Sequence, residues 1–267
     1  MRFYLSYFKL RFIIGLQYRA AAYAGFFTQI FFGLIFIMVY LAFYESGSGN
    51  TPMTIEQLVS YLWLNQAFFS LFNMLYKDGE IFASIKNGNV AYELTRPKKL
   101  YFMWYSKIIG QRFAMVTLRC LPVLLLAFFL PKPFRLGLPV SFLNFILFIL
   151  TLIIGALLMT AIVTLYPIIT LRTIDPKGIP TIFASIADIL SGLVVPIPFF
   201  PKFLQIISNA LPFRYMSDLS FRIYVGNIGL KEGLIGLAIQ FVWVFIIIGI
   251  GYFCTKKALK RIVVQGG

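Results

Sequence analysis

Residues 77–107, KDGEIFASIKNGNVAYELTRPKKLYFMWYSK, form the longest polar interval in a strongly apolar chain. On both sides of this interval lie apolar runs long enough to cross the ~30 Å hydrocarbon core of a bilayer. A hydrophobic protein with one sizeable polar loop on its basic side is expected to use that loop to contact a soluble partner. The charged residues of the interval are Lys77, Asp78, Glu80, Lys86, Glu93, Arg96, Lys98, Lys99 and Lys107.

The composition points to the same class of protein. Of the 267 residues, 60% are hydrophobic and only 12% are charged, whereas soluble domains carry about 25% charged residues. The sequence therefore predicts an all-α integral membrane protein with a single transmembrane domain over residues 1–267. We expect a multi-pass protein of the cell inner or plasma membrane.

The net charge of +15 would suggest nucleic-acid binding in a soluble protein. In a membrane protein, Lys and Arg accumulate in cytoplasmic loops, so no nucleic-acid partner is expected. There are no histidines, and the two cysteines, Cys120 and Cys254, both fall inside predicted helices. Neither a disulfide framework nor a metal site is expected from this set.

Six apolar segments are predicted to cross the membrane. Lys and Arg concentrate before the first segment, in the 77–107 interval, in the short loop 171–178 and after the last segment, which places both termini in the cytoplasm. Residues 1–19 carry basic and aromatic residues and are predicted to form an interfacial helix, with a frayed basic leader as the alternative. Pro167 is expected to kink the fourth helix. The six segments are residues 20–44, 57–76, 110–130, 142–170, 179–195 and 233–255.

The segment before the last helix is broken by prolines. Three prolines within SGLVVPIPFFPKF, residues 191–203, cannot share one straight helix. Residues 215–224 are amphipathic, with Asp218 and Arg222 one turn apart on one face. Residues 196–226 are therefore predicted to form short re-entrant helices that cap the outer mouth of a pathway, and the alternative is an apolar surface loop. The gate residues in this prediction are Pro196, Pro198, Pro201 and Pro212.

A few polar residues fall within the predicted membrane helices. Arg119 and Asp188 each lie about nine residues from the cytoplasmic end of their helices, roughly 13 Å deep at the helical rise. An arginine near the bilayer centre costs on the order of 3 kcal/mol without a partner or water. We predict that the two residues pair, within one chain or across a dimer, either as structural contacts or along the substrate path. Asn65, Gln66 and Asn73 are expected to bridge helices or to line that path.

No enzyme motif is visible. The chain lacks the G-x-x-x-x-G-K-[ST] loop of ATP hydrolysis. Without histidine it also lacks His-based triads and H-E-x-x-H sites. It is therefore expected to be non-catalytic and to need no cofactor of its own.

Two stretches resemble the ABC-2 family of transporter permeases. Residues 85–97, IKNGNVAYELTRP, resemble the I-x-x-G-x-[IVL]-x-x-x-L-x-[RK]-P stretch between helices 2 and 3 of drug- and peptide-export permeases. Residues 191–201 with 211–213 resemble the S-G-x-x-x-P-x-x-x-x-P and L-P-F region before their last helix. The layout resembles the family over nearly the whole chain.

This resemblance implies a permease driven by ATP–Mg hydrolysis on a separate ABC ATPase subunit, present in two copies. It also implies a second permease chain, identical or homologous, that completes the pathway, and a short cytoplasmic coupling helix. Closure of the ATPases would push on residues 80–88 and switch access to the pathway. The expected coupling residues are Glu80, Ile81, Ser84, Ile85, Gly88, Asn89, Arg96 and Pro97.

The sparse polar lining favours a peptide, drug or other amphipathic cargo. The alternative function is an ATPase-independent secondary transporter or channel. Such proteins often show internal repeats and paired broken helices, whereas this chain shows one broken region and no clear repeat. A membrane enzyme or scaffold has no positive feature in its favour.

Overall fold

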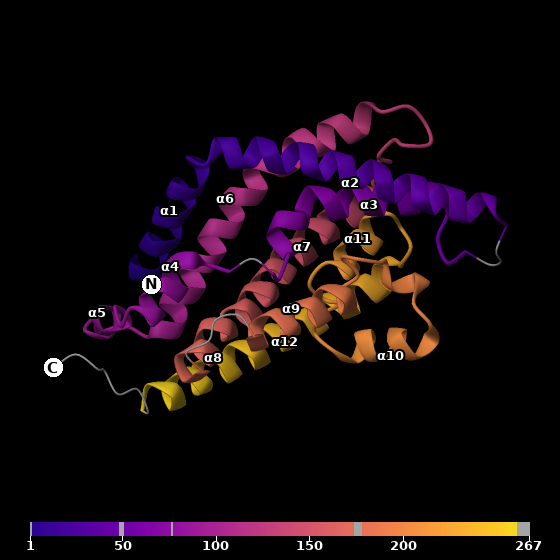
Figure 1. Cartoon of the computed structure of the whole chain (residues 1–267). Coiled ribbons are helices and arrows are strands. Elements are labelled where there is room, and N and C mark those ends of the chain that lie inside the picture. The colour runs from indigo at the N-terminus through magenta and orange to yellow at the C-terminus, as the bar shows by residue number, and fades with distance from the viewer. Residues whose placement is uncertain (1, 48–50, 76, 174–177, 261–267) are drawn as a thin grey trace.

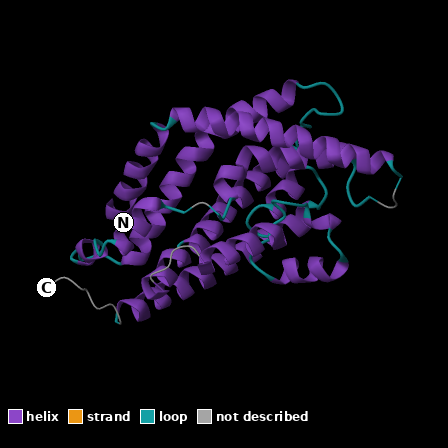
Figure 2. Ribbon diagram, in the orientation of Figure 1, coloured by secondary structure: helices purple, strands orange, loops and turns teal. Residues whose placement is uncertain are grey.

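The structure is a computed structural model that describes residues 2–47, 51–75, 77–173 and 178–260. Every regular element in these ranges is a helix, as Figures 1 and 2 show. The all-α class predicted from the sequence is therefore confirmed. In chain order the elements are α1 (Arg2–Leu16), α2 (Arg19–Glu45), α3 (Ile55–Phe72), α4 (Gly79–Lys86), α5 (Val90–Leu94), α6 (Leu100–Phe129), α7 (Phe142–Val163), α8 (Leu165–Thr173), α9 (Gly178–Leu190), the 3₁₀ turn η1 (Ile197–Phe199), α10 (Lys202–Ala210), α11 (Asp218–Tyr224) and α12 (Leu230–Leu259).

Among the described residues, four helical segments are long and apolar enough to cross a membrane: α2, α6, Phe142–Leu171 and α12. Helix α9 has 13 residues, about 20 Å, which is shorter than a ~30 Å hydrocarbon core. Helix α3 has 18 residues and is buried over most of its length. The multi-pass class is thus supported, and six crossings remain a prediction.

Helix α6 begins at Leu100, ten residues before the start predicted from the sequence. Its first half packs along α1. A Cβ atom added to Gly110 would lie 2.5 Å from the backbone oxygen of Phe8, so the two helices are in close contact there. The predicted N-terminal helix therefore exists, but one side of it rests on α6.

The predicted kink near Pro167 appears as a break between α7 and α8. Proline has no N–H to offer the carbonyl four residues earlier, which here belongs to Val163, the last residue of α7. Helix α12 runs along α7. The amide of Gln240 on α12 donates to the carbonyls of Thr151, at 3.0 Å, and Tyr215, at 2.6 Å.

The two ends of the helical bundle differ in content. Figure 1 places the start of α1, the short helices α4 and α5, and the last turns of α12 at one end. The turn η1 and helices α10 and α11 lie toward the other end. The placement of both termini on one side of the membrane stays a prediction.

Glycine at position 155 allows α7 to contact the chain just before α11. A Cβ atom there would lie within 2.1 Å of the backbone oxygen of Met216. We expect Gly155→Ala to lower the free energy of unfolding by about 1–3 kcal/mol, the usual cost of overpacking. Thermal unfolding of the full chain in detergent measures this effect.

The matched control is Gly249→Ala on α12, where an added Cβ meets nothing within 4 Å. Its stability should stay the same or rise slightly, since alanine favours the helix. Equal destabilisation by both variants would show that the contact at Gly155 does not matter.

Candidate functional site

Helix α4 forms near the start of the polar interval, where a coupling helix is expected. The carboxylate of Asp78 caps it by accepting hydrogen bonds from the backbone N–H groups of Glu80, at 3.1 Å, and Ile81, at 3.2 Å. Such a side-chain cap satisfies donors that a helix leaves unpaired at its start. Ile81 faces inward and is buried, and α4 packs against α8. A short helix is thereby fixed at the end of the bundle.

A group of ion pairs ties α4 to its neighbours. Arg11 of α1 contacts Glu80 at 2.7 Å and Asp78 at 3.5 Å, and Lys107 of α6 contacts Glu80 at 3.5 Å. Lys107 also binds Glu93 of α5. Arg11 and Lys107 are nearly buried, with 11% and 7% of their side chains exposed. We call these five residues the ion cluster.

Glu93 has a second partner on α6, because the indole N–H of Trp104 donates to it at 2.6 Å. The sequence patterns alone indicated no role for Arg11, Glu93, Trp104 or Lys107. The signal that could have found them is the helical spacing of Trp104 and Lys107, three residues apart, next to an acidic residue one loop away.

The basic residues that follow α5 lie against the aromatic face of α1. The guanidinium of Arg96 lies 5.8 Å from the ring centre of Tyr7, and the ammonium of Lys98 lies 5.6 Å from that of Phe3. These are cation–π distances. The loop around the predicted Arg96–Pro97 pair is thus attached to the N-terminal helix.

The outer side of this region is a groove of about 430 Å³ between α4 and α5. Of the predicted coupling residues, Glu80, Ser84 and Asn89 line it, whereas Ile81 is buried and Ile85 half-buried. Gly88 and the Arg96–Pro97 pair are exposed beside it. Gly88 has φ of +72°, a conformation in which glycine carries little strain. Tyr92, also on the groove, is 74% exposed.

The predicted pairing of Arg119 with Asp188 inside one chain is wrong for the described residues. Arg119 donates to the carbonyl of Ala21 on α2, at 3.0 Å. Asp188 accepts from the backbone N–H of Met74, at 3.0 Å, and the charge that acts on it is that of Arg112. The predicted depth of Arg119 was counted from a helix start at residue 110. In the structure α6 begins ten residues earlier, at Leu100, and its first part lies beside α1.

Arg112 is the fully buried arginine of α6. It donates to the carbonyls of Asn73, at 2.6 Å, and Leu71, at 3.2 Å. These oxygens lie at the end of α3, and the last carbonyls of a helix have no N–H partner within the helix. Arg112 thus holds the end of α3 next to Asp188.

The three amides predicted in the second helix have different positions. Asn65 donates to the carbonyl of Leu193, at 2.8 Å, and so bridges α3 to the segment before η1. Gln66 is buried next to Gly33 of α2. Asn73 lies just past the end of α3, where its side chain accepts from the N–H of Leu75.

The four predicted gate prolines punctuate the short outer helices. Pro196 precedes η1, Pro198 lies within it, and Pro201 precedes α10. Pro212 lies in the turn that follows α10. The short helices expected before the last span are thus present, and their role as a gate stays a prediction.

Asp218 at the start of α11 is the centre of a buried polar group. It is fully buried and accepts from the hydroxyl of Tyr61 on α3, at 2.9 Å. Arg214 and Arg222 each lie 3.7 Å from its carboxylate. Burial raises the pKa of Asp218, and Arg222 and Arg214 oppose that shift. The Asp218–Arg222 contact follows from helical spacing, whereas Tyr61 is 157 residues away and had no local signal.

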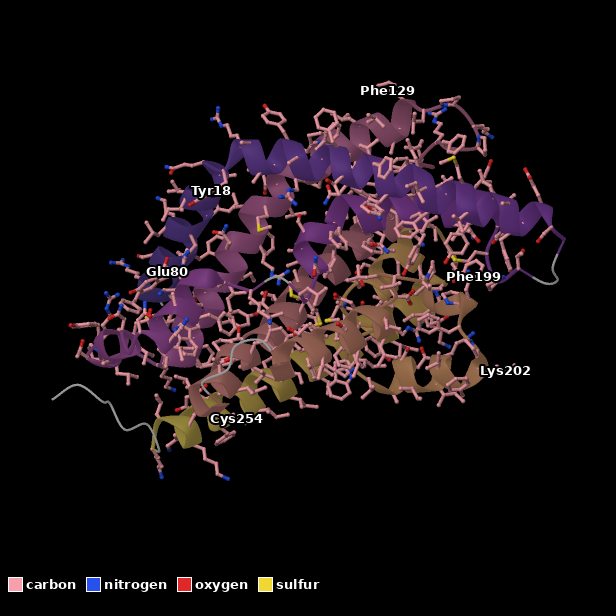
Figure 3. All side chains as sticks on the ribbon, in the orientation of Figure 1. Tyr18, Glu80, Phe129, Phe199, Lys202 and Cys254 are labelled. Carbon is pink, nitrogen blue, oxygen red and sulfur yellow. The ribbon has the colours of Figure 1, made fainter. Side chains whose placement is uncertain are left out.

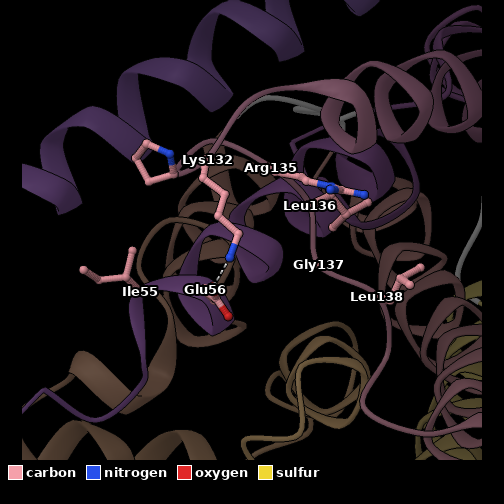
Figure 4. A pocket seen from close by; sticks show the side chains of 8 residues that line it. Ile55, Glu56, Lys132, Arg135, Leu136, Gly137 and Leu138 are labelled. Carbon is pink, nitrogen blue, oxygen red and sulfur yellow. Dashed lines mark hydrogen bonds and ion pairs between the residues drawn. The ribbon is translucent and has the colours of Figure 1, made fainter.

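The loop between α6 and α7 borders a second cavity, of about 410 Å³. Figure 4 shows Lys132 and Glu56 joined by an ion pair of 3.1 Å across its rim. Both side chains are about 80% exposed, so this pair contributes little stability.

The family model described as "ABC-2 type transporter" matches residues 12–225 of the chain. No curated protein matches the chain. The matched range begins within α1 and ends after α11, so it contains four of the five residues of the ion cluster, all but Arg11, and the short helices before α12.

Double-mutant cycles can test the revised pairing of Asp188. We expect Arg112→Met and Asp188→Asn to be coupled by at least about 0.5 kcal/mol in the free energy of unfolding, as for residues that share a network. Arg119→Met and Asp188→Asn should be additive within about 0.5 kcal/mol. Denaturation in mixed micelles gives both values, and coupling through Arg119 alone would restore the original pairing.

The buried group around Asp218 gives a second prediction. Asp218→Ala should destabilise the chain by about 3–5 kcal/mol, because it leaves two arginines without their buried counter-charge. Glu232→Gln is the control, since Glu232 lies 3.6 Å from Arg214 with 60% of its side chain exposed. Its effect should stay below about 1 kcal/mol. Similar losses in the two variants would contradict this account.

Proposed function

The chain belongs to the ABC-2 type transporter family, and we propose that it is the permease of an exporter whose ATPase lies on a separate subunit. Proteins of this family are generally non-catalytic membrane subunits that work with an ATPase. In this proposal ATP–Mg is bound and hydrolysed on the partner, in two copies. A second permease chain, the same or homologous, completes the pathway in the cell inner or plasma membrane.

The ion cluster is the observation that carries the proposal. A force on α4 reaches α1 through Arg11 and reaches α6 through Lys107. Separating a buried ion pair leaves an uncompensated charge, which costs about 3–5 kcal/mol. Lys107 and Glu93, with 7% and 15% of their side chains exposed, form such a pair. Helices α4, α5 and α6 should therefore move together rather than slide past one another.

The groove between α4 and α5 is the proposed docking surface for the ATPase. Glu80, Ser84 and Asn87 supply polar groups, and Tyr92 supplies an exposed aromatic side chain. Exposed aromatic residues beside polar groups are frequent anchors in protein interfaces. In this role α4 is the coupling helix, and Arg96 and Pro97 hold the loop beside it.

The proposed movement continues from α6 into the membrane. Arg112 of α6 binds the end of α3, and Asn65 of α3 binds the segment before η1. A shift of α6 would thus reach the outer short helices, the proposed gate with Pro196, Pro198, Pro201 and Pro212. This is a rigid-body route from the cytoplasmic end to the outer end.

The proposed cargo is a peptide, drug or other amphipathic molecule moved outward. The polar side chains within the helices are committed to contacts between helices, as Asn65 and Arg112 show. A wall with few remaining polar groups suits an apolar or amphipathic molecule better than a highly charged one.

Charge reversal at Glu80 tests the docking and the ion cluster together. Glu80→Arg adds a third cation beside Arg11 and Lys107, and like charges this close cost several kcal/mol. We expect the ATPase that copurifies with the full-length chain from native membranes to fall by about tenfold, the effect of ~1.4 kcal/mol. Adding Arg11→Glu should restore much of it.

The matched control is Glu56→Arg. Glu56 is also an exposed carboxylate in an ion pair, but its partner Lys132 lies in the loop between α6 and α7 and not beside α4. It should leave copurification unchanged. The proposal fails if the wild-type chain brings down no ATP-binding cassette ATPase, or if a membrane-impermeant reagent labels Tyr92→Cys from outside the cell.

A further inference from the structure

A polar pocket of about 360 Å³ lies among the short helices before α12. Its walls come from η1, α10, α11 with the turn after it, and Pro52 in the loop between α2 and α3. Figure 3 labels Phe199 on η1 and Lys202 at the start of α10, which lie at this end of the molecule. Figure 1 places α4 and α5 at the opposite end. Four of the lining residues have polar side chains: Gln205, Asn209, Arg222 and Asn227.

Arg222 supplies the charge of the pocket wall, because none of the other described lining residues is ionisable. Its Nε atom donates to the side-chain oxygen of Asn227 at 2.7 Å, and the amide of Asn227 donates to the carbonyl of Pro52 at 3.1 Å. Only 16% of the Arg222 side chain is exposed. Its two terminal nitrogens make no hydrogen bond to a described residue, although Nη1 lies 3.7 Å from the carboxylate of Asp218. Asn227 thus fixes Arg222 and leaves its terminal N–H groups available to a ligand.

The positive charge of Arg222 is only partly compensated. Asp218 lies 3.7 Å from both Arg222 and Arg214, so one carboxylate serves two guanidinium groups. These three side chains together carry one excess positive charge. Glu232 also contacts Arg214, at 3.6 Å, but 60% of its side chain is exposed, and exposed ion pairs are weak. An anion in the pocket would therefore complete the charge balance around Arg222.

Helix α10 adds an acceptor and a donor to the same pocket. Gln205 donates to the carbonyls of Phe200, at 2.8 Å, and Pro198, at 3.2 Å, which leaves its side-chain oxygen as an acceptor. Asn209 accepts from Arg214, which leaves its amide N–H groups as donors. The two residues are one turn apart and lie on one face of α10. The pocket thus suits a ligand with a negative group next to an N–H or O–H group.

We propose that this pocket binds a carboxylate group of the cargo. The carboxylate accepts hydrogen bonds from the terminal nitrogens of Arg222, in the planar pairing that guanidinium and carboxylate groups favour. Asn209 adds a donor, and Gln205 accepts an N–H such as the last amide of a peptide. Pockets for small molecules have about 300–1,000 Å³, so this one has room for a terminal group rather than for a whole large molecule.

The statement that the carboxylate belongs to a cargo rests on the proposed function. Pro198 of the proposed gate lines the pocket, so a group bound here would lie where a cargo leaves the pathway. One carboxylate on an otherwise apolar molecule agrees with the amphipathic cargo proposed above. The bound group would also join α10 to α11, and through Asp218 and Tyr61 to α3.

Isothermal titration calorimetry on the full-length chain in phosphatidylcholine nanodiscs tests the proposal. The probes are N-acetyl-alanyl-phenylalanine with a free carboxylate and the same peptide with a C-terminal amide. We expect the carboxylate form to bind at least about tenfold more tightly, the effect of ~1.4 kcal/mol. Arg222→Gln should remove this preference. Arg135→Gln is the matched control and should keep it, because Arg135 lies over the ring of Phe128 beside another cavity.

A second variant keeps the test informative if Arg222→Gln folds poorly. Asn227→Asp keeps an acceptor for Arg222 but places a negative charge beside it, so it should weaken binding of the carboxylate peptide about tenfold and leave the amide peptide unchanged. The proposal is overturned if the amide form binds as tightly as the carboxylate form, or if neither binds. It also fails if folded Arg222→Gln and Asn227→Asp keep the wild-type preference.

Glycerol phosphate, which carries the phosphate of a lipid headgroup, separates the two sources of an anion. It should compete for the pocket more weakly than the carboxylate peptide. Stronger competition by glycerol phosphate would overturn the assignment to a cargo carboxylate and favour a lipid phosphate.

This assay contains no ATPase, so it separates the pocket from the proposed function. If an ATPase copurifies with the chain but the carboxylate preference is absent, the carboxylate site alone is rejected. If the preference is present but no ATPase copurifies, the proposed function is rejected, and with it the assignment of the carboxylate to an exported cargo.

Discussion

Charged groups that leave water must find partners, because an uncompensated charge in an apolar environment costs several kcal/mol. This constraint accounts for the main fixed points of the chain. Lys107 lies between Glu80 and Glu93, at the end of the bundle that holds α4. Arg112 lies against the carbonyls that end α3. Asp218 lies among Tyr61, Arg214 and Arg222, near the short helices before α12. Each group joins different helices, and Tyr61 and Asp218 are 157 residues apart in the sequence.

These fixed points give the chain a consistent mechanical layout. The first joins the short helix α4 to α1, α5 and α6, the second joins α6 to α3, and the third joins α3 to α11. The end of the bundle that holds α4 and the short helices before α12 are thereby connected through the same helices. The apolar contacts around them, such as the one at Gly155, keep the helices close enough for these polar contacts to form.

The differences between the predicted and observed elements have one main cause. Most of the run LYFMWYSKII, residues 100–109, was predicted to belong to the polar loop, because it contains Lys107 and follows Arg96, Lys98 and Lys99. In the structure this run is the first third of α6, since Glu93 neutralises Lys107 and α1 covers the aromatic side chains. The change moved Arg119 from the predicted membrane centre to the start of α2. It also brought Arg112 rather than Arg119 next to Asp188.

Composition, hydrophobic length and spacing within one helical turn predicted the all-helical membrane class, the proline-broken segment, and the i, i+4 contact of Asp218 with Arg222, because these are local properties. The resemblance to the ABC-2 family implied a short helix in the loop where α4 lies. Which charges meet and where α6 begins follow from the packing of the helices. Those outcomes depend on contacts such as Arg11–Glu80 and Tyr61–Asp218, whose partners are brought together by helix packing and have no periodic signal in the sequence.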